Sequence, residues 1–306
     1  MGHLTGVWVA MPTPWTADWS IDRGAVRELV LRYHAAGLDG AYTTGTDGEM
    51  HVVDLVAFRQ LASVFGDATA GTGLPAQMGC TASDIHGVIE RARIAAAHGV
   101  RRIQAAFPSW VQLTDAGVLR FFAVIQDALP DMEIIHYNLA TTGRFLTGND
   151  YRAIREVAPN LIGSKHTGGN IASLIEITSA TPDLDHFVVD SQIIPGALFG
   201  ARGFYSFLAN LSPTLALAIM DHARQRLWEQ GAALRRRIDA FMSTWLRSCL
   251  EITSSPALIK IATGAGVLPS IPLRVRGPWE SGTSHHVDAL NRMFSQMFPE
   301  YVHELE

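Results

Sequence analysis

Short apolar segments alternate along the chain with longer segments whose apolar residues recur every three or four positions. The first short segment, Gly6–Ala10, is typical of a strand that ends before Pro12, and Asp22–Ala36 is typical of a helix closed by Gly37. The same alternation continues through the chain. The predicted strands are Gly6–Ala10, Leu38–Thr44, Gln77–Gly79, Arg101–Ala106, Glu133–Tyr137, Leu161–Lys165, Phe187–Asp190 and Gly203–Phe207. The predicted helices after them are Asp22–Ala36, Val53–Val64, Asp84–His98, Thr114–Leu129, Gly148–Val157, Asn170–Ala180, Pro195–Phe199 and Pro213–Glu229.

This order of elements predicts an α/β protein with a closed parallel sheet. Parallel strands need crossover helices, and eight strand–helix units close as a (β/α)8 TIM barrel, which we expect over residues 1–231. The alternative is an open doubly wound sheet, but no G-x-G-x-x-G follows the first strand. Residues 232–306 are expected to form a helical extension packed on the barrel. Its predicted helices are Ala233–Leu250, Pro256–Thr263 and Ser284–Phe298.

The composition is that of a globular protein with a sizeable core. Of 306 residues, 48% are hydrophobic and 17% are charged, and the net charge is −5. This balance gives no reason to expect a nucleic acid partner, and the apolar runs are too short for the ~18 residues of a membrane span. Cys80 and Cys249 lie far apart, and Met1–Thr5 lacks the pattern of a signal peptide, so we expect a cytoplasmic protein.

The basic residues are unusual, because of 24 Lys and Arg only Lys165 and Lys260 are lysines. A lysine kept in such a chain points to a task that Arg cannot perform, and amine chemistry is one, because guanidinium stays protonated and is a poor nucleophile. Lys165 ends a predicted strand, where active sites of this fold gather. An ammonium inside a barrel is poorly solvated, which favours the neutral amine that attacks carbonyls to form imines. A lysine paired with an acid at a strand end is the alternative.

Other polar residues follow neighbouring strands. Tyr137 ends the strand before that of Lys165, and its phenol can move protons during imine formation, although an aromatic residue can also cap a barrel. The turn Gly45–Gly48 can present backbone N–H groups to a carboxylate, and the Thr46 hydroxyl could relay a proton to Tyr137. His166 is expected to point away from Lys165 by strand alternation. We find no zinc-type spacing of His and Cys, so neither a metal nor another cofactor is predicted.

Together these segments resemble the dihydrodipicolinate synthase / N-acetylneuraminate lyase family of class I (Schiff-base) aldolases. The likeness extends over about Gly6–Val275. The matching segments, in chain order, are Gly6–Pro14, Gly45–Glu49 for the family's G-T-T-G-E, Tyr137-Asn138, and Ile162–Lys165 followed by Gly169-Asn170.

The resemblance implies a role for each matched residue. Lys165 would form an imine with pyruvate or a related 2-oxo acid, and no further cofactor would be needed. Tyr137 would shuttle protons and Thr46 would link to it, while the amides of Thr46 and Asp47, with Gly45, would hold the substrate carboxylate. Tyr205 would line the pocket. The family also implies a homotetramer built as a dimer of dimers.

Three residues depart from the family pattern. Asp47 stands where the G-T-T-G-E motif has its second Thr, and an ionised carboxylate would repel a substrate carboxylate unless it turns away, is protonated, or binds a substrate hydroxyl or amine. Trp110 stands where lysine-pathway members donate a tyrosine across the dimer. The Arg that follows Tyr-Asn in those synthases is also missing, because Arg144 falls past that position.

Trp110 and the missing Arg argue against a dihydrodipicolinate synthase proper. Trp110, the Pro12–Pro14 opening and Asp47 at the second Thr position resemble hydratase-aldolases such as hydroxybenzylidenepyruvate hydratase-aldolase. Trp110 would then face an aryl or bulky aldehyde, although it could instead fill space at a subunit contact. A dehydratase of a 2-keto-3-deoxy sugar acid is the alternative, with Thr141 and Thr142 in a polar pocket. A barrel that only binds a small metabolite is the third hypothesis.

Overall fold

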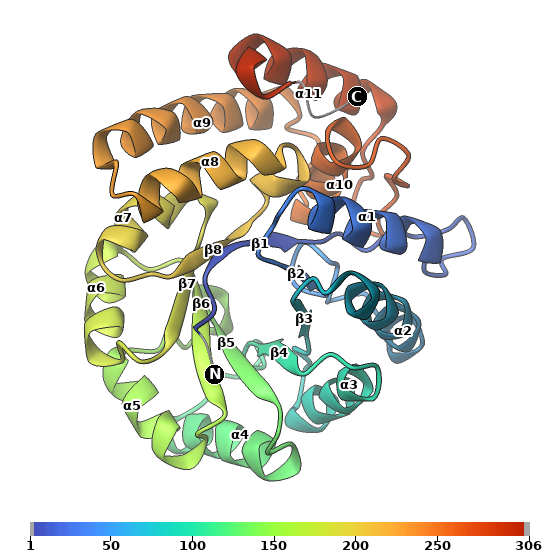
Figure 1. Cartoon of the computed structure of the whole chain (residues 1–306). Helices are drawn as coiled ribbons and strands as arrows, with labels where there is room; N and C mark the ends of the chain where they lie inside the picture. Colours follow the sequence, from blue (N-terminus) through green and yellow to red (C-terminus); the bar gives the residue numbers. More distant parts are fainter. Residues whose placement is uncertain (1–2, 303–306) are drawn as a thin grey trace.

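A computed structural model describes residues 3–302 as a closed barrel of eight parallel strands. Each strand pairs with its neighbours in chain order, and β8 pairs back onto β1 (Figure 1). This closure confirms the predicted barrel and excludes the open doubly wound sheet. The strands are β1 (Gly6–Ala10), β2 (Gly40–Thr43), β3 (Ala76–Gly79), β4 (Arg102–Ala105), β5 (Glu133–Leu139), β6 (Leu161–Thr167), β7 (Asp185–Val189) and β8 (Gly203–Ser206).

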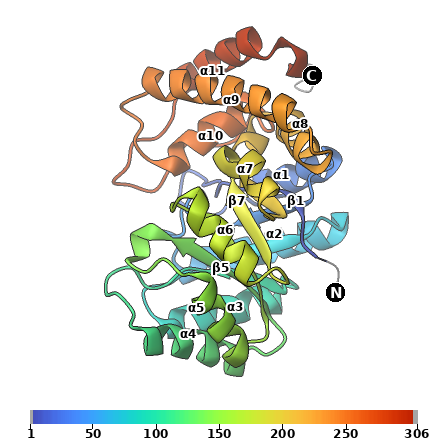
Figure 2. The same ribbon diagram turned by 90° about the vertical axis from the view of Figure 1, so that its left-hand side faces the viewer.

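One helix follows each strand on the outside of the barrel, and three more form the C-terminal extension. The outer helices are α1 (Arg23–Ala35), α2 (Leu55–Thr72), α3 (Ile85–Ala97), α4 (Asp115–Ala128), α5 (Gly148–Val157), α6 (Ile171–Ala180), α7 (Ile193–Leu198) and α8 (Pro213–Arg224). The extension consists of α9 (Trp228–Ser248), α10 (Ser255–Ala265) and α11 (Ser284–Met297). Figure 2 shows these three helices grouped at one side of the barrel, where α9 packs on α8. Across residues 3–302, no helix combines the length and apolar character that crossing a membrane requires.

The helix limits follow from capping residues. The Asp22 carboxylate accepts from the Ala25 N–H at the start of α1, and Asp54 does the same for the Ala57 N–H at the start of α2. α2 continues to Thr72, beyond the predicted end at Val64, because its buried face continues and the chain leaves the helix only at the left-handed Gly73.

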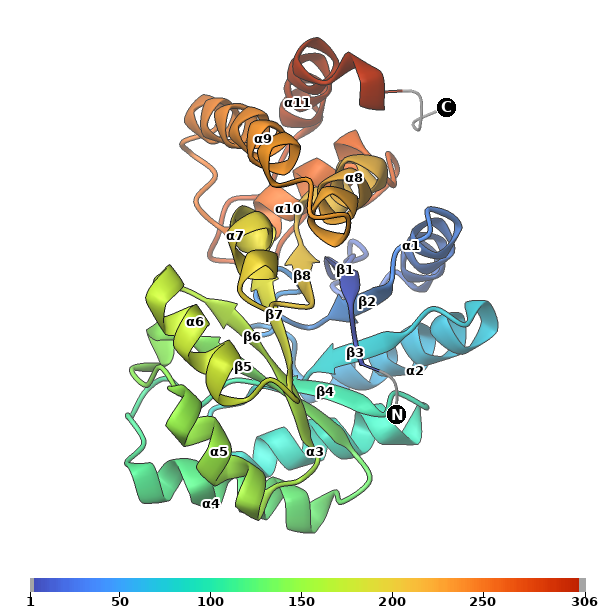
Figure 3. The same ribbon diagram turned by 60° about the vertical axis from the view of Figure 1, so that its left-hand side comes forward.

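Strand β6 continues beyond Lys165, where the sequence pattern ended it. It pairs with β5 as far as Leu139 and Thr167, and Tyr137 lies directly beside Lys165 in this pairing. Figure 3 shows α6 and α7 outside β6 and β7. The pairing places the Tyr137 and Lys165 side chains next to each other on the inner surface of the barrel.

The barrel interior is aromatic, and the larger apolar core lies between the strands and the surrounding helices. Trp8, Tyr42, Phe187 and Tyr205 form one buried cluster inside the barrel. In this fold alternate strands fill the interior in layers. Tyr42, Lys165 and Tyr205 come from the alternate strands β2, β6 and β8 and meet near the carboxyl ends of those strands.

Candidate active site

Lys165 lies inside the barrel and is surrounded by phenol rings. Its side chain is almost fully buried, with 5% exposure of the residue. Its Nζ lies 4.3 Å from the centre of the Tyr137 ring, 5.0 Å from that of Tyr205 and 5.5 Å from that of Tyr42. Within residues 3–302, no acidic side chain forms an ion pair with this amine, whereas Lys260 pairs with Glu49. The geometry thus leaves the Lys165 amine without an acidic partner.

Tyr137 stands closest to the amine and its hydroxyl is uncommitted. The residue is 4% exposed, and no described protein group accepts from or donates to its hydroxyl. Because Tyr137 and Lys165 are paired on adjacent strands, their relative position is fixed by the sheet itself. A phenol held beside an amine in this way can exchange protons with a group bound to that amine.

Tyr205 and Tyr42 complete the ring of phenols. The Tyr205 hydroxyl donates to the Gln77 side-chain oxygen over 2.6 Å, and the Tyr42 and Tyr205 rings meet edge to face at 5.3 Å. Burial raises the pKa of both phenols, so both stay protonated at neutral pH. Tyr205 is a predicted site residue, whereas Tyr42 is not among those predicted from the sequence. The signal that could have found it is the alternation along β2, which directs this residue inward.

The conformation of the Gly45–Glu49 turn is fixed by its backbone angles and by the buried side chain of Glu49. Thr44 and Glu49 adopt positive φ angles at its ends, and a Cβ on Gly48 would lie 2.6 Å from the Thr44 nitrogen. Glu49 is 1% exposed and accepts from Trp15 over 2.9 Å and from Lys260 over 2.5 Å. The turn is therefore fixed by a buried carboxylate on its inner side.

Among the described residues, two backbone donors of this turn have no backbone acceptor. In the described part of the chain, the N–H groups of Thr46 and Asp47 donate to no carbonyl oxygen. The Thr46 side chain is exposed and forms no hydrogen bond with Tyr137, so the predicted link between them stays a prediction. Asp47 is half-buried, and its carboxylate accepts from the Ser255 hydroxyl at the start of α10. Of the alternatives for Asp47, the structure favours a side chain that is turned toward the extension.

Trp110, Thr141 and Thr142 meet in a cleft of about 630 Å³ at the carboxyl ends of β3, β4 and β5. Trp110 is 96% exposed, and Thr142 is buried and donates to the Leu139 carbonyl oxygen over 2.8 Å. The cleft also has polar walls. Its further polar lining includes His51, Thr81, Ser83, Asp84, Arg91 and Ser109. Lys165 is not part of this lining, so the cleft does not enclose the amine.

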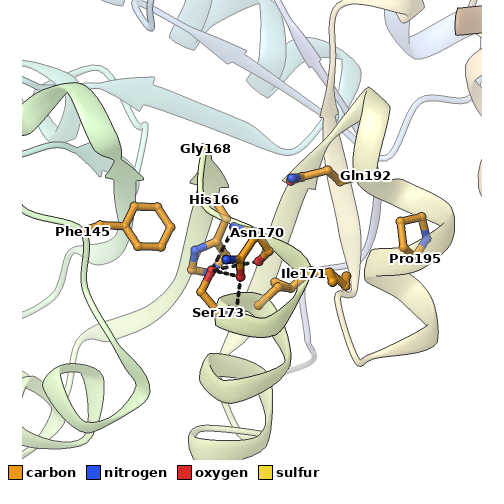
Figure 4. A pocket seen from close by; sticks show the side chains of 9 residues that line it. Phe145, His166, Gly168, Asn170, Ile171, Ser173, Gln192 and Pro195 are labelled. Atoms are coloured by element: carbon orange, nitrogen blue, oxygen red, sulfur yellow. Dashed lines mark hydrogen bonds between the residues drawn. The ribbon is translucent and has the colours of Figure 1, made fainter.

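A smaller pocket of about 90 Å³ lies beyond the end of β6 (Figure 4). Figure 4 shows Phe145 on one side of it and Gln192 with Pro195 on the other. Asn170 caps α6 by accepting from the Ser173 N–H over 2.9 Å, so its side chain serves the helix. This pocket is formed mainly by the packing of α6 against its neighbouring loops.

The outer face of β6 carries a buried histidine network. Ser164 hydrogen-bonds His166 over 2.7 Å and His186 over 2.8 Å, and Asn138 lies 3.3 Å from His166. Burial lowers the pKa of His166 well below its usual value and that of His186 to about 4, so both rings are neutral. His166 thus points away from Lys165, as the alternation predicted, and helps to fix the strand that carries the amine.

The sequence that forms this barrel is matched by a known family. The family model "Dihydrodipicolinate synthetase family" matches residues 3–296, so the chain belongs to this family. A 4-hydroxy-tetrahydrodipicolinate synthase from Exiguobacterium sibiricum is 25% identical over 289 residues, which is 93% of this chain and 96% of the relative. An N-acetylneuraminate lyase from Rhizobium meliloti is 28% identical over 276 residues, covering 89% and 88% of the two chains.

Solved structures agree on the fold. YagE, a prophage protein of this family from E. coli K12 solved in complex with pyruvate, superposes with a TM-score of 0.83 at 20% sequence identity. The superposition covers 96% of this chain and 98% of YagE. The matched relatives are named as synthases and lyases, which places this chain in a family of enzymes.

Proposed function

We propose that the protein is a Schiff-base lyase that makes or cleaves a C–C bond between pyruvate and an aldehyde through an imine on Lys165. The observation that carries this proposal is the Lys165 amine, which is buried among three phenols and unpaired with an acid in the described residues. Its relatives include a synthase and a lyase, and the structure of YagE was solved with pyruvate.

The proposed chemistry begins when the Lys165 nitrogen attacks the C2 carbonyl of the 2-oxo acid. A C–N bond forms as the C2–O π bond breaks, and the proton that the nitrogen loses is transferred to the oxygen to give a carbinolamine. Tyr137 then donates a proton to the C2 hydroxyl, which leaves as water while the nitrogen lone pair forms the iminium. The positively charged iminium can accept the electron pair of the C3–C4 bond when that bond breaks.

Cleavage uses the same two residues, but Tyr137 now accepts a proton instead of donating one. The substrate C4 hydroxyl gives its proton to Tyr137, the C3–C4 bond breaks, and its electron pair forms an enamine on Lys165 as the aldehyde leaves. Tyr137 then returns this proton to C3. Water adds to C2 and gives a proton to Tyr137, and the C–N bond breaks to release pyruvate and the free amine. The free N–H groups of Thr46 and Asp47 are suited to hold the carboxylate during these steps.

The acceptor aldehyde is proposed to lie in the cleft beside Trp110. The indole is 96% exposed and offers a flat apolar face to an aryl or bulky aldehyde. Trp110→Ala should then reduce turnover with bulky aldehydes and leave small ones unaffected, as measured by kcat/KM over a panel of aldehydes. A loss of the dimer, measured by light scattering, with equal loss for all aldehydes would assign Trp110 to a subunit contact.

Dehydration of a 2-keto-3-deoxy sugar acid through the same imine is the second candidate. It is favoured by the polar lining of the cleft, in which Thr81, Ser83 and the exposed Thr141 offer hydroxyl groups. Product analysis separates the two reactions, because the dehydratase releases water and retains every C–C bond.

A homotetramer is the proposed assembly. Val111, which follows Trp110 in the chain and is 70% exposed, offers apolar surface for one of the subunit contacts.

The experiment that tests this function is reductive trapping. The protein is treated with borohydride in the presence of a panel of 2-oxo acids, digested, and examined by mass spectrometry for a modified peptide. Pyruvate should add one reduced pyruvyl mass to the peptide that contains Lys165. Modification of Lys260, or of neither lysine, would exclude both the lyase and the dehydratase and leave a barrel that only binds a metabolite.

A further inference from the structure

The turn that is suited to a substrate carboxylate lacks a side-chain donor at Asp47. An ionised carboxylate only accepts hydrogen bonds, and this one is already engaged by the Ser255 hydroxyl. The backbone N–H groups of Thr46 and Asp47 remain free, so the turn keeps its amide donors. A carboxylate has about four lone-pair sites, so two amides leave part of it without a protein donor.

Tyr42 places a phenol hydroxyl directly against this turn. A Cβ built on Gly45 would lie 2.4 Å from the Tyr42 hydroxyl oxygen, and one built on Gly79 would lie 3.0 Å from it. The absence of a side chain at Gly45 is what lets the hydroxyl reach the first residue of the turn. The same ring faces the Lys165 Nζ at 5.5 Å, so the side chain of Tyr42 spans the distance between the turn and the amine.

The Tyr42 hydroxyl is also free to donate. Tyr205 gives its hydroxyl hydrogen to Gln77, whereas no group in residues 3–302 is hydrogen-bonded to the Tyr42 hydroxyl. Burial raises the pKa of Tyr42 well above its usual value, and the nearby Tyr137, Tyr205 and Asp47 act in the same direction. The phenol is therefore protonated at neutral pH and available as a donor to an anion.

We propose that the Tyr42 hydroxyl donates a hydrogen bond to the carboxylate of the bound 2-oxo acid, in place of the hydroxyl that Asp47 does not provide. The inference rests on the proposed function, because it assigns one further binding residue to the same substrate. In a 2-oxo acid the carboxylate is bonded to C2. A carboxylate held between Tyr42 and the amides of the turn therefore brings C2 toward the Lys165 amine.

The test measures how imine formation depends on the ketone concentration in wild type and Tyr42→Phe. Two probes are used, pyruvate and acetone, which share the ketone and differ in the carboxylate. A hydrogen bond to a charged group predicts that Tyr42→Phe raises the half-saturating pyruvate concentration by about 10- to 100-fold. The value for acetone should not change, and the rate of trapping at saturating pyruvate should stay close to that of wild type.

Tyr33→Phe is the matched control. It also removes a buried phenol hydroxyl, one that donates to the Asn210 side-chain oxygen and not to a group of the turn, and it should not change the pyruvate dependence. Equal effects of Tyr42→Phe on pyruvate and acetone, or no effect on pyruvate, would overturn the inference while leaving imine formation intact. Absence of trapping at Lys165 in the wild type would instead overturn the proposed function.

A second pair of variants keeps the inference testable if Tyr42→Phe folds poorly. Asp47→Thr in the wild-type background supplies a hydroxyl in the turn, and Asp47→Asn removes the same charge without supplying one. If Tyr42 already fills the missing position, Asp47→Thr should lower the half-saturating pyruvate concentration no more than Asp47→Asn does. If Asp47→Thr lowers the half-saturating pyruvate concentration clearly more than Asp47→Asn does, the substrate carboxylate lacks a hydroxyl donor in the wild type. That result would contradict the inference.

Discussion

The two lysines of this chain are both buried, and their surroundings differ in almost every other respect. Lys165 is 5% exposed and faces three phenol rings, whereas Lys260 is fully buried and contacts Glu49 and the Arg274 carbonyl oxygen, both at 2.5 Å. Burial lowers the pKa of Lys260 to about 8, and Glu49 acts in the opposite direction. Burial alone therefore does not distinguish the two lysines, whereas the presence of an acidic partner does: within residues 3–302 Lys260 has one and Lys165 has none.

The comparison also explains why the chain keeps two lysines among so many arginines. Lys260 fits a narrow site in which one ammonium bonds a carboxylate and a carbonyl oxygen, and a planar guanidinium has a different shape. Glu49 closes the turn that holds the free amides of Thr46 and Asp47. Lys260 thus supports the site through structure, and Lys165 is proposed to act in it by chemistry.

The largest expected effect is that of Lys165→Arg. The variant should lose all turnover and all borohydride labelling, because a guanidinium does not form the imine. Its melting temperature should stay near that of wild type, as measured by circular dichroism, because no described ion pair is broken. Measurable turnover in this folded variant would rule out imine catalysis.

Tyr137→Phe should reduce kcat by about 10²–10⁴, the range typical of lost acid–base catalysis. Labelling at Lys165 should persist at long incubation, since the amine itself is unchanged. Steady-state kinetics would measure the loss of turnover, and borohydride trapping of the same variant would measure labelling at Lys165. An unchanged kcat would remove Tyr137 from the proposed mechanism.

Lys260→Met should destabilise the fold by about 3–5 kcal/mol, because it leaves Glu49 charged and unpaired in the interior. Urea unfolding would measure this loss, and the double variant Lys260→Met, Glu49→Leu should recover part of it. The folded single variant should still be labelled at Lys165 by pyruvate and borohydride. Loss of that label in folded protein would contradict the division of roles between the two lysines.

Acid should weaken the packing of β5 and β7, the two strands that pair with the Lys165 strand β6 and carry the buried rings of His136 and His186. Burial lowers the pKa of His136 to about 3 and that of His186 to about 4, so both bind fewer protons folded than unfolded. Stability should therefore fall as the pH decreases from about 6.5 toward 4, by up to about 1.4 kcal/mol per pH unit for each ring. Urea unfolding between pH 7 and 5 measures this slope, and His136→Gln should reduce it. A flat profile would show that these rings do not titrate as buried groups.

Much of the fold could be predicted from local patterns. The alternation of short apolar segments with amphipathic ones gave the barrel, and α5 was predicted with both ends correct. The C-terminal end of α2 was not predicted correctly. Its last turns are stabilised by packing against other elements, and a local sequence pattern carries no information about those contacts. The end of β6 was missed for a similar reason, since its last residues pair with β5 rather than follow an apolar run.

The site was partly predictable in the same sense. Lys165 and Tyr137 stand next to each other because adjacent strands of a barrel align their ends, which sequence order alone suggests. The partner of Asp47 is Ser255, which lies 208 positions away on α10, and only the folded chain brings them together. Tyr42 was overlooked because its importance depends on its distance to Gly45 and Lys165, and no motif encodes that distance.

Imine formation on Lys165 is best examined by mapping the lysine that pyruvate modifies under borohydride in the wild-type protein. We expect one added reduced pyruvyl group, on the peptide that contains Lys165, with the Lys260 peptide unmodified. Modification at Lys260, or recovery of both peptides without added mass, would contradict this expectation.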